Sequence, residues 1–155
     1  MPVFHRLLSQ DVCEIVVRCH PLENPADFVQ RWLCRYGRMP SGLRISKGDS
    51  LDKLLSRTDV ALMFRSTVMI DCVANKIPVI MPGWIDFGFS RDKLLDIPCV
   101  YFADDFIDLE NRIHEWLKDP PQMDEKILNF FVQPPRIGRE QFRAMLKNLV
   151  FPKQG

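Results

Sequence analysis

The sequence lacks the features that mark membrane and secreted proteins. No apolar stretch among its 155 residues approaches the length of about 20 residues that a membrane-spanning helix needs. The N-terminus has no long apolar core of the kind found in secretion signals. We therefore expect a cytoplasmic protein with no membrane span.

The sequence also lacks the cysteine and carboxylate motifs that mark disulfide-bonded and metal-binding proteins. The five cysteines are odd in number and include no Cys-x-x-Cys pair, which argues against both a disulfide framework and a zinc site. There is no Asp-x-Asp motif, so the sequence does not indicate a divalent metal. We expect free thiols in a reducing compartment, Cys72 as a small core residue, and no cofactor.

Neither sign of charge is in excess. The chain has 21 Lys and Arg against 20 Asp and Glu, which gives a formal net charge of +1. This balance gives no electrostatic reason to expect a nucleic-acid polymer or an anionic membrane as partner. Chemistry on a small ligand is compatible with it.

Short apolar runs alternate with stretches of helical period along residues 1–118. The alternation predicts one α/β domain with a Rossmann-like open parallel sheet, covered by helices on both faces. The predicted strands are 14–18, 43–46, 60–64, 77–82 and 98–102. The predicted helices are 25–36, a short helix that begins at 49 or 50, 67–75 and 108–118.

Two of these strands and one helix carry more specific signals. The run 60–64 is almost wholly apolar, as expected of a central strand covered on both faces, whereas 43–46 is typical of an edge strand. Asn24 is expected to cap the helix 25–36, with Pro25 at its first position.

The last part of the chain differs from the body. Pro120-Pro121 and Pro134-Pro135 mark off residues 119–155 as a proline-rich tail. Apolar residues at helical spacing predict a helix over 140–149, packed back on the domain.

Two short polar motifs stand where predicted strands end. Arg18-Cys19-His20-Pro21 follows the strand 14–18, and Arg65-Ser66-Thr67 follows the strand 60–64 and opens the next helix. In open α/β sheets, ligands bind outside the carboxyl ends of the strands. Two hydroxyl groups beside the free N–H groups of a helix start suit a phosphate.

Each motif also has a purely structural interpretation. Ser and Thr are ordinary N-cap residues that need no ligand, and a lone His after a strand is more often a structural hydrogen-bonding residue. The aromatic segment 83–89 is either a lid or base-stacking loop or packing for the core. Arg44 and Lys47 flank a strand end where a base or a phosphate could bind, although surface Arg and Lys side chains are usually solvated.

Three features together resemble the C-terminal, donor-binding half of a GT-B glycosyltransferase. They are the strand-terminal Arg18-Cys19-His20-Pro21, the Ser66-Thr67 pair, and the run 74–80 from that helix into the next strand. The chain is most similar to the branches that use cytidine nucleotides, which are the capsule-polysaccharide enzymes, the bacterial sialyltransferases and the glycerol phosphate transferases.

The resemblance implies a role for each motif residue. His20, Ser66 and Thr67 would contact the phosphates of a nucleotide-sugar donor, and Asp71 would hold the ribose at a position where the family more often has Glu. The nucleotide would be of the CMP, CDP or UDP type. The implied process is polysaccharide biosynthesis.

Sugar transfer creates negative charge on the departing nucleoside phosphate, so a catalyst needs cations and hydrogen-bond donors aimed at it. Arg18, His20 and Arg65 could supply them, and a protonated His20 could act as the general acid. In GT-B enzymes the acceptor pocket usually belongs to the N-terminal half. We therefore expect this chain to bind a nucleotide but to transfer sugar only with an acceptor-binding domain or subunit.

Two other functions stay open at this point. One is a sugar-nucleotide epimerase-like domain, which shares the architecture but needs further acidic residues near the anomeric carbon. The other is a non-catalytic, Rossmann-like interaction module whose tail, with Phe130-Phe131 and Phe142, binds a partner protein.

Overall fold

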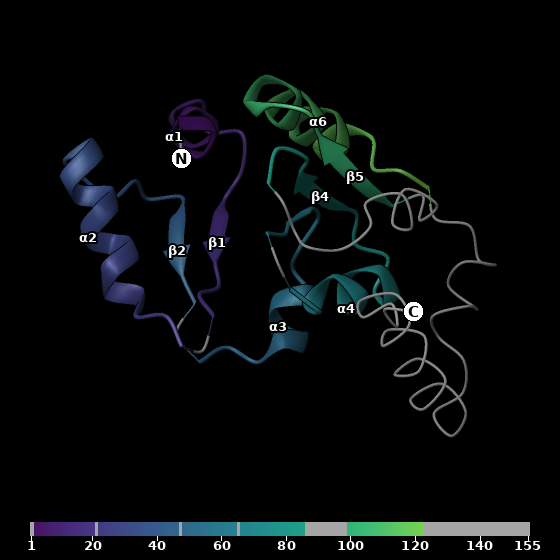
Figure 1. Cartoon of the computed structure of the whole chain (residues 1–155), viewed down its shortest axis with the longest axis horizontal. Coiled ribbons are helices and arrows are strands. Elements are labelled where there is room, and N and C mark those ends of the chain that lie inside the picture. The colour runs from purple at the N-terminus through teal and green to yellow at the C-terminus, as the bar shows by residue number, and fades with distance from the viewer. Residues whose placement is uncertain (1, 21, 47, 65, 86–98, 123–155) are drawn as a thin grey trace, which may run out of the picture. The chain divides into compact units, whose positions relative to one another are not determined.

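The computed structural model describes residues 2–20, 22–46, 48–64, 66–85 and 99–122. The chain divides into two compact units, Met1–Leu54 and Leu55–Gly155. Unit 1 runs from purple to blue in Figure 1, and the described part of unit 2 runs from teal to green. Both units are of the mixed α/β type, with parallel strands and helices.

Unit 1 is built around a pair of parallel strands. Its elements are α1 (Pro2–Ser9), β1 (Ile15–Val17), α2 (Pro25–Tyr36), β2 (Leu43–Ile45) and the start of α3 (Leu51–Leu55). Ile15 lies opposite Leu43, and Val17 opposite Ile45. The helix α2 lies alongside these strands (Figure 1) and packs Phe28 and Trp32 into the core. 

The helix α2 matches its prediction at both ends. It begins at Pro25, and the Asn24 side chain accepts a hydrogen bond from the Ala26 amide at 3.1 Å. It ends at Gly37, whose φ of 75° is a left-handed conformation that favours glycine. The buried Trp32 indole N–H donates to the Arg38 carbonyl at 3.0 Å, so its polar atom is satisfied.

Unit 2 contains a three-stranded parallel sheet. Its elements are β3 (Ala61–Leu62), α4 (Val68–Ala74), β4 (Val79–Pro82), β5 (Val100–Ala103) and α6 (Phe106–Lys118). The strand order is β3-β4-β5, and every residue of β4 is buried. Both α4 and α6 pack against β4. The core of unit 2 consists of the side chains of β4 together with buried apolar side chains of α4 and α6. Those of the two helices are Cys72, Val73, Leu109, Ile113 and Trp116.

Three expectations need correction. The run 60–64 was predicted as a wholly buried central strand, but β3 spans only two residues at an edge of the described sheet, and Phe64 is 52% exposed. The central strand is β4, whose two neighbours cover its hydrogen-bonding groups.

The helix α1 was not predicted, although Val3 and Leu7 have the i, i+4 spacing of a buried helical face. The helix α6 starts at Phe106, two residues before its predicted start.

The architecture agrees with the prediction at the coarse level. Five parallel strands lie at the predicted places, but in the described part of the chain they pair within two separate sheets and not in one. None of the helices described here is both long enough and apolar enough to cross a membrane. The predicted helix 140–149, most of the tail and Arg65 lie outside the described residues.

Candidate functional site

The carboxyl edge of β1 and β2 gathers polar side chains in unit 1. Arg18 follows β1 directly, and Ser46 follows β2. The Ser46 amide donates to the Val17 carbonyl at 2.9 Å, which continues the parallel pairing to the ends of both strands. Since both strands run in the same direction, the residues after them emerge at one edge.

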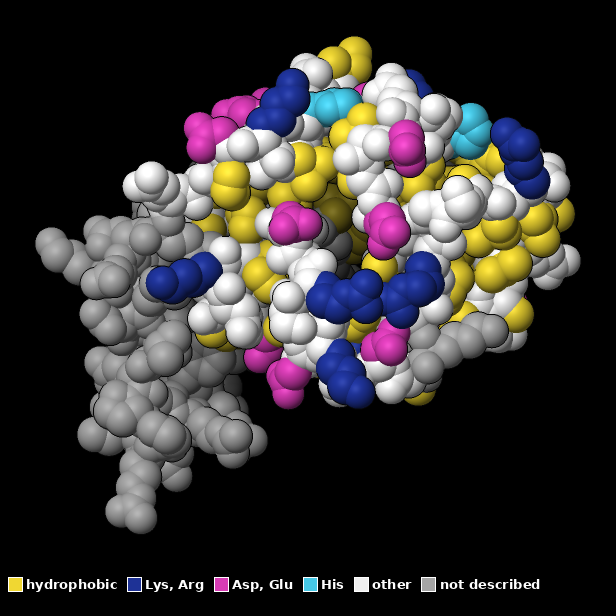
Figure 2. Space-filling view, turned by 180° about the vertical axis from the view of Figure 1, so that it is seen from behind, with side chains coloured by type: hydrophobic (Ala, Val, Ile, Leu, Met, Phe, Trp, Pro, Cys, Tyr) yellow, Lys and Arg dark blue, Asp and Glu magenta, His cyan; other side chains and the backbone are white. Residues whose placement is uncertain are grey.

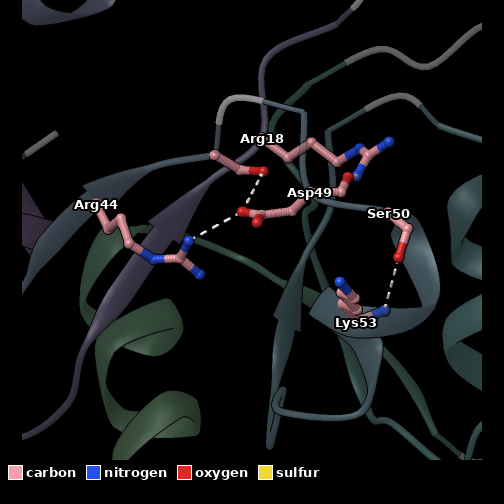
Figure 3. A network of polar contacts seen from close by, with 6 residues as sticks. Arg18, Arg44, Asp49, Ser50 and Lys53 are labelled. Carbon is pink, nitrogen blue, oxygen red and sulfur yellow. Dashed lines mark hydrogen bonds and ion pairs between the residues drawn. The ribbon is translucent and has the colours of Figure 1, made fainter.

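Asp49 connects the side chains at this edge (Figure 3). Its carboxylate Oδ2 accepts from Ser46 Oγ at 3.0 Å and from Arg44 Nη1 at 2.9 Å. Its backbone carbonyl accepts from Arg18 Nη1 at 2.9 Å. The Ser46 hydrogen bond, followed by the Arg44 hydrogen bond and charge, lowers the pKa of Asp49. We call Arg18, Arg44, Ser46 and Asp49 the Asp49 network.

The Asp49 network holds two guanidinium groups at the strand ends. Arg18 and Arg44 lie on either side of Asp49 (Figure 3), and both side chains are exposed. Each guanidinium has five N–H donors in a planar fork that matches phosphate oxygens. The contacts with Asp49 orient each side chain and leave most of these donors to solvent. This edge can therefore bind an anion.

His20 lies in a turn between β1 and α2. Its amide donates to Glu23 Oε2 at 2.9 Å, and its carbonyl accepts from the Glu23 amide at 2.8 Å. Its Nδ1 accepts from the Leu22 amide at 3.2 Å. An imidazole that accepts at Nδ1 carries its proton on Nε2, so the neutral His20 ring offers one N–H donor.

Unit 2 places the second motif at the start of α4. Ser66 Oγ accepts from the Val68 amide at 3.1 Å and so takes up one free N–H of the helix start. Thr67 is the N-cap residue by position, but its side chain makes no capping hydrogen bond. Both residues are exposed. The Thr67 hydroxyl therefore does not take part in capping α4.

Asp71 lies in the first turn of α4 and is exposed. Its backbone carbonyl accepts from Asn75 Nδ2 at 2.8 Å. Arg65, the remaining predicted site residue, falls outside the described part of the chain. In the described ranges no group of three or more His, Cys, Asp or Glu side chains could hold a metal ion.

The predicted residues therefore form two sets. Arg18 and His20 belong to unit 1, whereas Ser66, Thr67 and Asp71 belong to unit 2. Each set follows the carboxyl end of a parallel strand in its own unit. That one ligand meets both sets stays a prediction.

Sequence reasoning missed the residue that orients the arginines. Asp49 was considered only as a possible start of the next helix, and Ser46 only as the end of a strand. The available signal was the polar residues at 44, 46 and 49, which lie within and just after a short strand. Gly48, with a φ of 84°, lets the loop turn so that Asp49 comes back to Ser46.

Charges of both signs lie side by side on the surface. On the face shown in Figure 2, Lys and Arg side chains lie among Asp and Glu side chains, and no patch of one sign covers the described part of this face. Comparison of the chain with family models, with curated proteins and with solved structures found no match. We therefore infer a function from the geometry of the two strand-end motifs.

Proposed function

We propose that this chain is the donor-binding domain of a nucleotide-sugar-dependent glycosyltransferase of Rossmann-like architecture. One observation carries the proposal. In unit 1 the motif directly follows β1, and in unit 2 Ser66 and Thr67 lie between the end of β3 and the start of α4; such strand ends are where ligands bind in open α/β sheets. The motifs supply cations, an imidazole and hydroxyl groups, which are donors suited to the phosphates of a nucleotide.

Unit 1 would bind the charge that develops during transfer. The reaction breaks the bond between the sugar carbon and the phosphate oxygen, and the nucleoside phosphate leaves with the electron pair. Fixed N–H donors stabilise that charge most when they need no reorganisation. Arg18 is already oriented by its 2.9 Å hydrogen bond to Asp49, and His20 offers its Nε2–H from a hydrogen-bonded turn.

The hydrogen bond at Nδ1 limits what His20 can do. Protonation of the ring would put a proton on Nδ1, where the Leu22 amide already donates at 3.2 Å. A general-acid role for His20 would therefore require that hydrogen bond to be released. As a neutral ring, His20 would serve as a hydrogen-bond donor to the leaving phosphate.

Unit 2 carries the second motif, which offers its own donors and acceptors to a nucleotide. Thr67 and Ser66 would bind phosphate oxygens at the start of α4, and Asp71 would accept hydrogen bonds from the ribose hydroxyls. Transfer to an acceptor would need a further domain or subunit with the acceptor pocket. The chain alone would then bind nucleotides without turnover.

Calorimetric titration of the full chain with CMP, CDP, UDP and GDP tests this function. We expect at least one of them to bind with a dissociation constant below the millimolar range. Circular dichroism on the same sample shows whether the protein is folded. If folded protein binds none of the four at millimolar concentration, the proposed function is wrong.

Thr67→Val is the sharpest single substitution in this titration. It removes the hydroxyl but keeps the branched shape, and α4 loses no capping bond because Thr67 makes none. We expect nucleotide binding to weaken by about 1 kcal/mol for one lost hydrogen bond, and by more where the acceptor is a charged phosphate. Ser9→Ala is the matched control, because Ser9 is an exposed hydroxyl residue on α1, where its Oγ donates to the Arg6 carbonyl of the same helix.

A further inference from the structure

Large apolar side chains are exposed mainly at one edge of unit 2. In the described part of the chain, eight such side chains are exposed, and five of them follow the strands of the three-stranded sheet. These five are Phe64, Trp84, Ile85, Phe106 and Ile107. Exposed apolar groups scattered singly need no explanation, but a concentration at one edge marks a binding surface.

The topology brings these side chains to the carboxyl edge. Phe64 comes two residues after β3, Trp84 two residues after β4, and Phe106 is the first residue of the helix after β5. The Gly83 amide donates to the Ala103 carbonyl at 2.6 Å, so β4 and β5 stay paired up to this edge. All three strands are parallel, and their ends therefore face the same way.

Trp84 and Phe106 meet as a pair of rings. Their centroids are 4.8 Å apart and the ring planes are inclined by 60°. Even so, Trp84 is 41% exposed and Phe106 is 47% exposed. We call this pair the ring corner. Because the rings are tilted and not stacked on each other, they leave aromatic surface open to a third ring.

The charges beside the ring corner narrow the choice of ligand. Asp104 and Asp105 follow β5 at the same edge, and both are exposed. Asp105 Oδ1 accepts from the amides of Ile107 and Asp108 at 2.7 and 2.8 Å, so this carboxylate is fixed beside Phe106. Carboxylates repel a phosphate but accept hydrogen bonds from the N–H groups of an uncharged ring.

We propose that the ring corner is a stacking site for a nucleobase, a planar, uncharged ring with N–H groups at its edge. The proposal rests on the proposed function, since the base would be that of the bound nucleotide. It assigns the base to Trp84 and Phe106 in unit 2, and it leaves the phosphates to the hydroxyl groups before α4 in the same unit.

Tryptophan fluorescence reports on the ring corner directly. The chain has three tryptophans; Trp32 is 0% and Trp116 is 6% exposed, so the ring of Trp84 is the accessible one. The probes are cytidine, uridine, adenosine and guanosine, each alone, and inorganic pyrophosphate. We expect at least one nucleoside to quench the fluorescence at millimolar concentration and pyrophosphate not to quench it.

Calorimetry on variants of the full chain separates the contribution of each ring. Trp84→Ala and Phe106→Ala should each weaken nucleoside binding about fivefold or more, the effect expected for loss of one stacking surface. Trp84→Phe should keep most of the affinity and lose the quenching. Leu33→Ala is the matched control, because Leu33 is also 41% exposed but lies on α2 in unit 1.

The outcomes separate the two proposals. If a nucleotide binds but Trp84→Ala and Phe106→Ala bind it unchanged, the stacking site is wrong and the proposed function stands. If nucleosides bind through Trp84, yet nucleotides bind no more tightly and Thr67→Val has no effect, the stacking site stands and the proposed function is wrong. If no nucleoside or nucleotide binds, or if sedimentation shows instead a self-association that Trp84→Ala abolishes, the stacking site is overturned.

Discussion

At the scale of single residues, the ionisation of Asp49 links the carboxyl edge of unit 1 to the pH dependence of stability. Its hydrogen bonds from Ser46 and Arg44 lower its pKa, so the ionised form is favoured in the folded chain. A carboxylate with a depressed folded-state pKa stabilises the fold above its unfolded value of about 4, and the stabilisation is lost as the pH falls through the folded pKa. Asp49→Asn should therefore lower stability at pH 6 and much less at pH 2.

Urea unfolding of both proteins at these two pH values measures that difference. Asp52→Asn is a suitable control, because it removes a nearby exposed carboxylate on α3 that is not part of the Asp49 network. A stability difference between Asp49→Asn and the original chain that is the same at both pH values would contradict the prediction. It would mean that the charge of Asp49 does not contribute.

Single residues differ in how far the sequence predicts them. Cys72 was expected to be a small core residue, and this is confirmed: it is buried in α4, and burial raises its pKa to about 12. The apolar residues that surround Cys72 in the sequence of this helix were sufficient to predict its burial. The partners of Asp49 could not be predicted, because they depend on how the loop 46–49 folds back on the strand ends.

At the scale of elements, the cap of α2 is a local feature with a measurable contribution. Asn24→Ala removes the hydrogen bond from the Ala26 amide and leaves that N–H without its protein partner. The expected loss is about 1 kcal/mol in the free energy of unfolding of unit 1, as for other N-cap replacements. Chemical denaturation measures it, and Asn24→Ser is the control that keeps a capping oxygen without placing a charge beside Asp27. An equal loss in both variants would show that the cap is not the cause.

Elements with strong local signals were predicted, and those without them were not. The helix α2 has a cap residue, a proline at its first position and a closing glycine, all readable along the chain. The helix α6 was predicted two residues short at its start, because the cap Asp105 stands in a run of polar residues that gives no unique start. The strand β3 was overestimated because apolar composition alone does not show where pairing stops.

At the scale of the molecule, composition predicts the class but not the arrangement. The alternation of apolar runs and helical stretches correctly indicated four or five parallel strands together with helices. It could not show that they pair as two strands and three strands, because pairing is set by contacts between distant residues. The same limit applies to the site. The sequence places each motif near a strand end, but it cannot show whether both motifs bind the same ligand.

The separate sheets predict how the molecule unfolds. Unit 1 and unit 2 each have their own strand pairing and their own buried side chains, so a local loss of stability in one need not open the other. With Asn24→Ala, amide hydrogen exchange measured by mass spectrometry should become about fivefold faster in peptides that cover β1 and β2, the factor for about 1 kcal/mol. Peptides that cover β4 and β5 should exchange at their original rates, and Asn24→Ser, which keeps a capping oxygen, should leave both sets unchanged. Equal acceleration in β4 would instead mean that the two units open together as one cooperative structure.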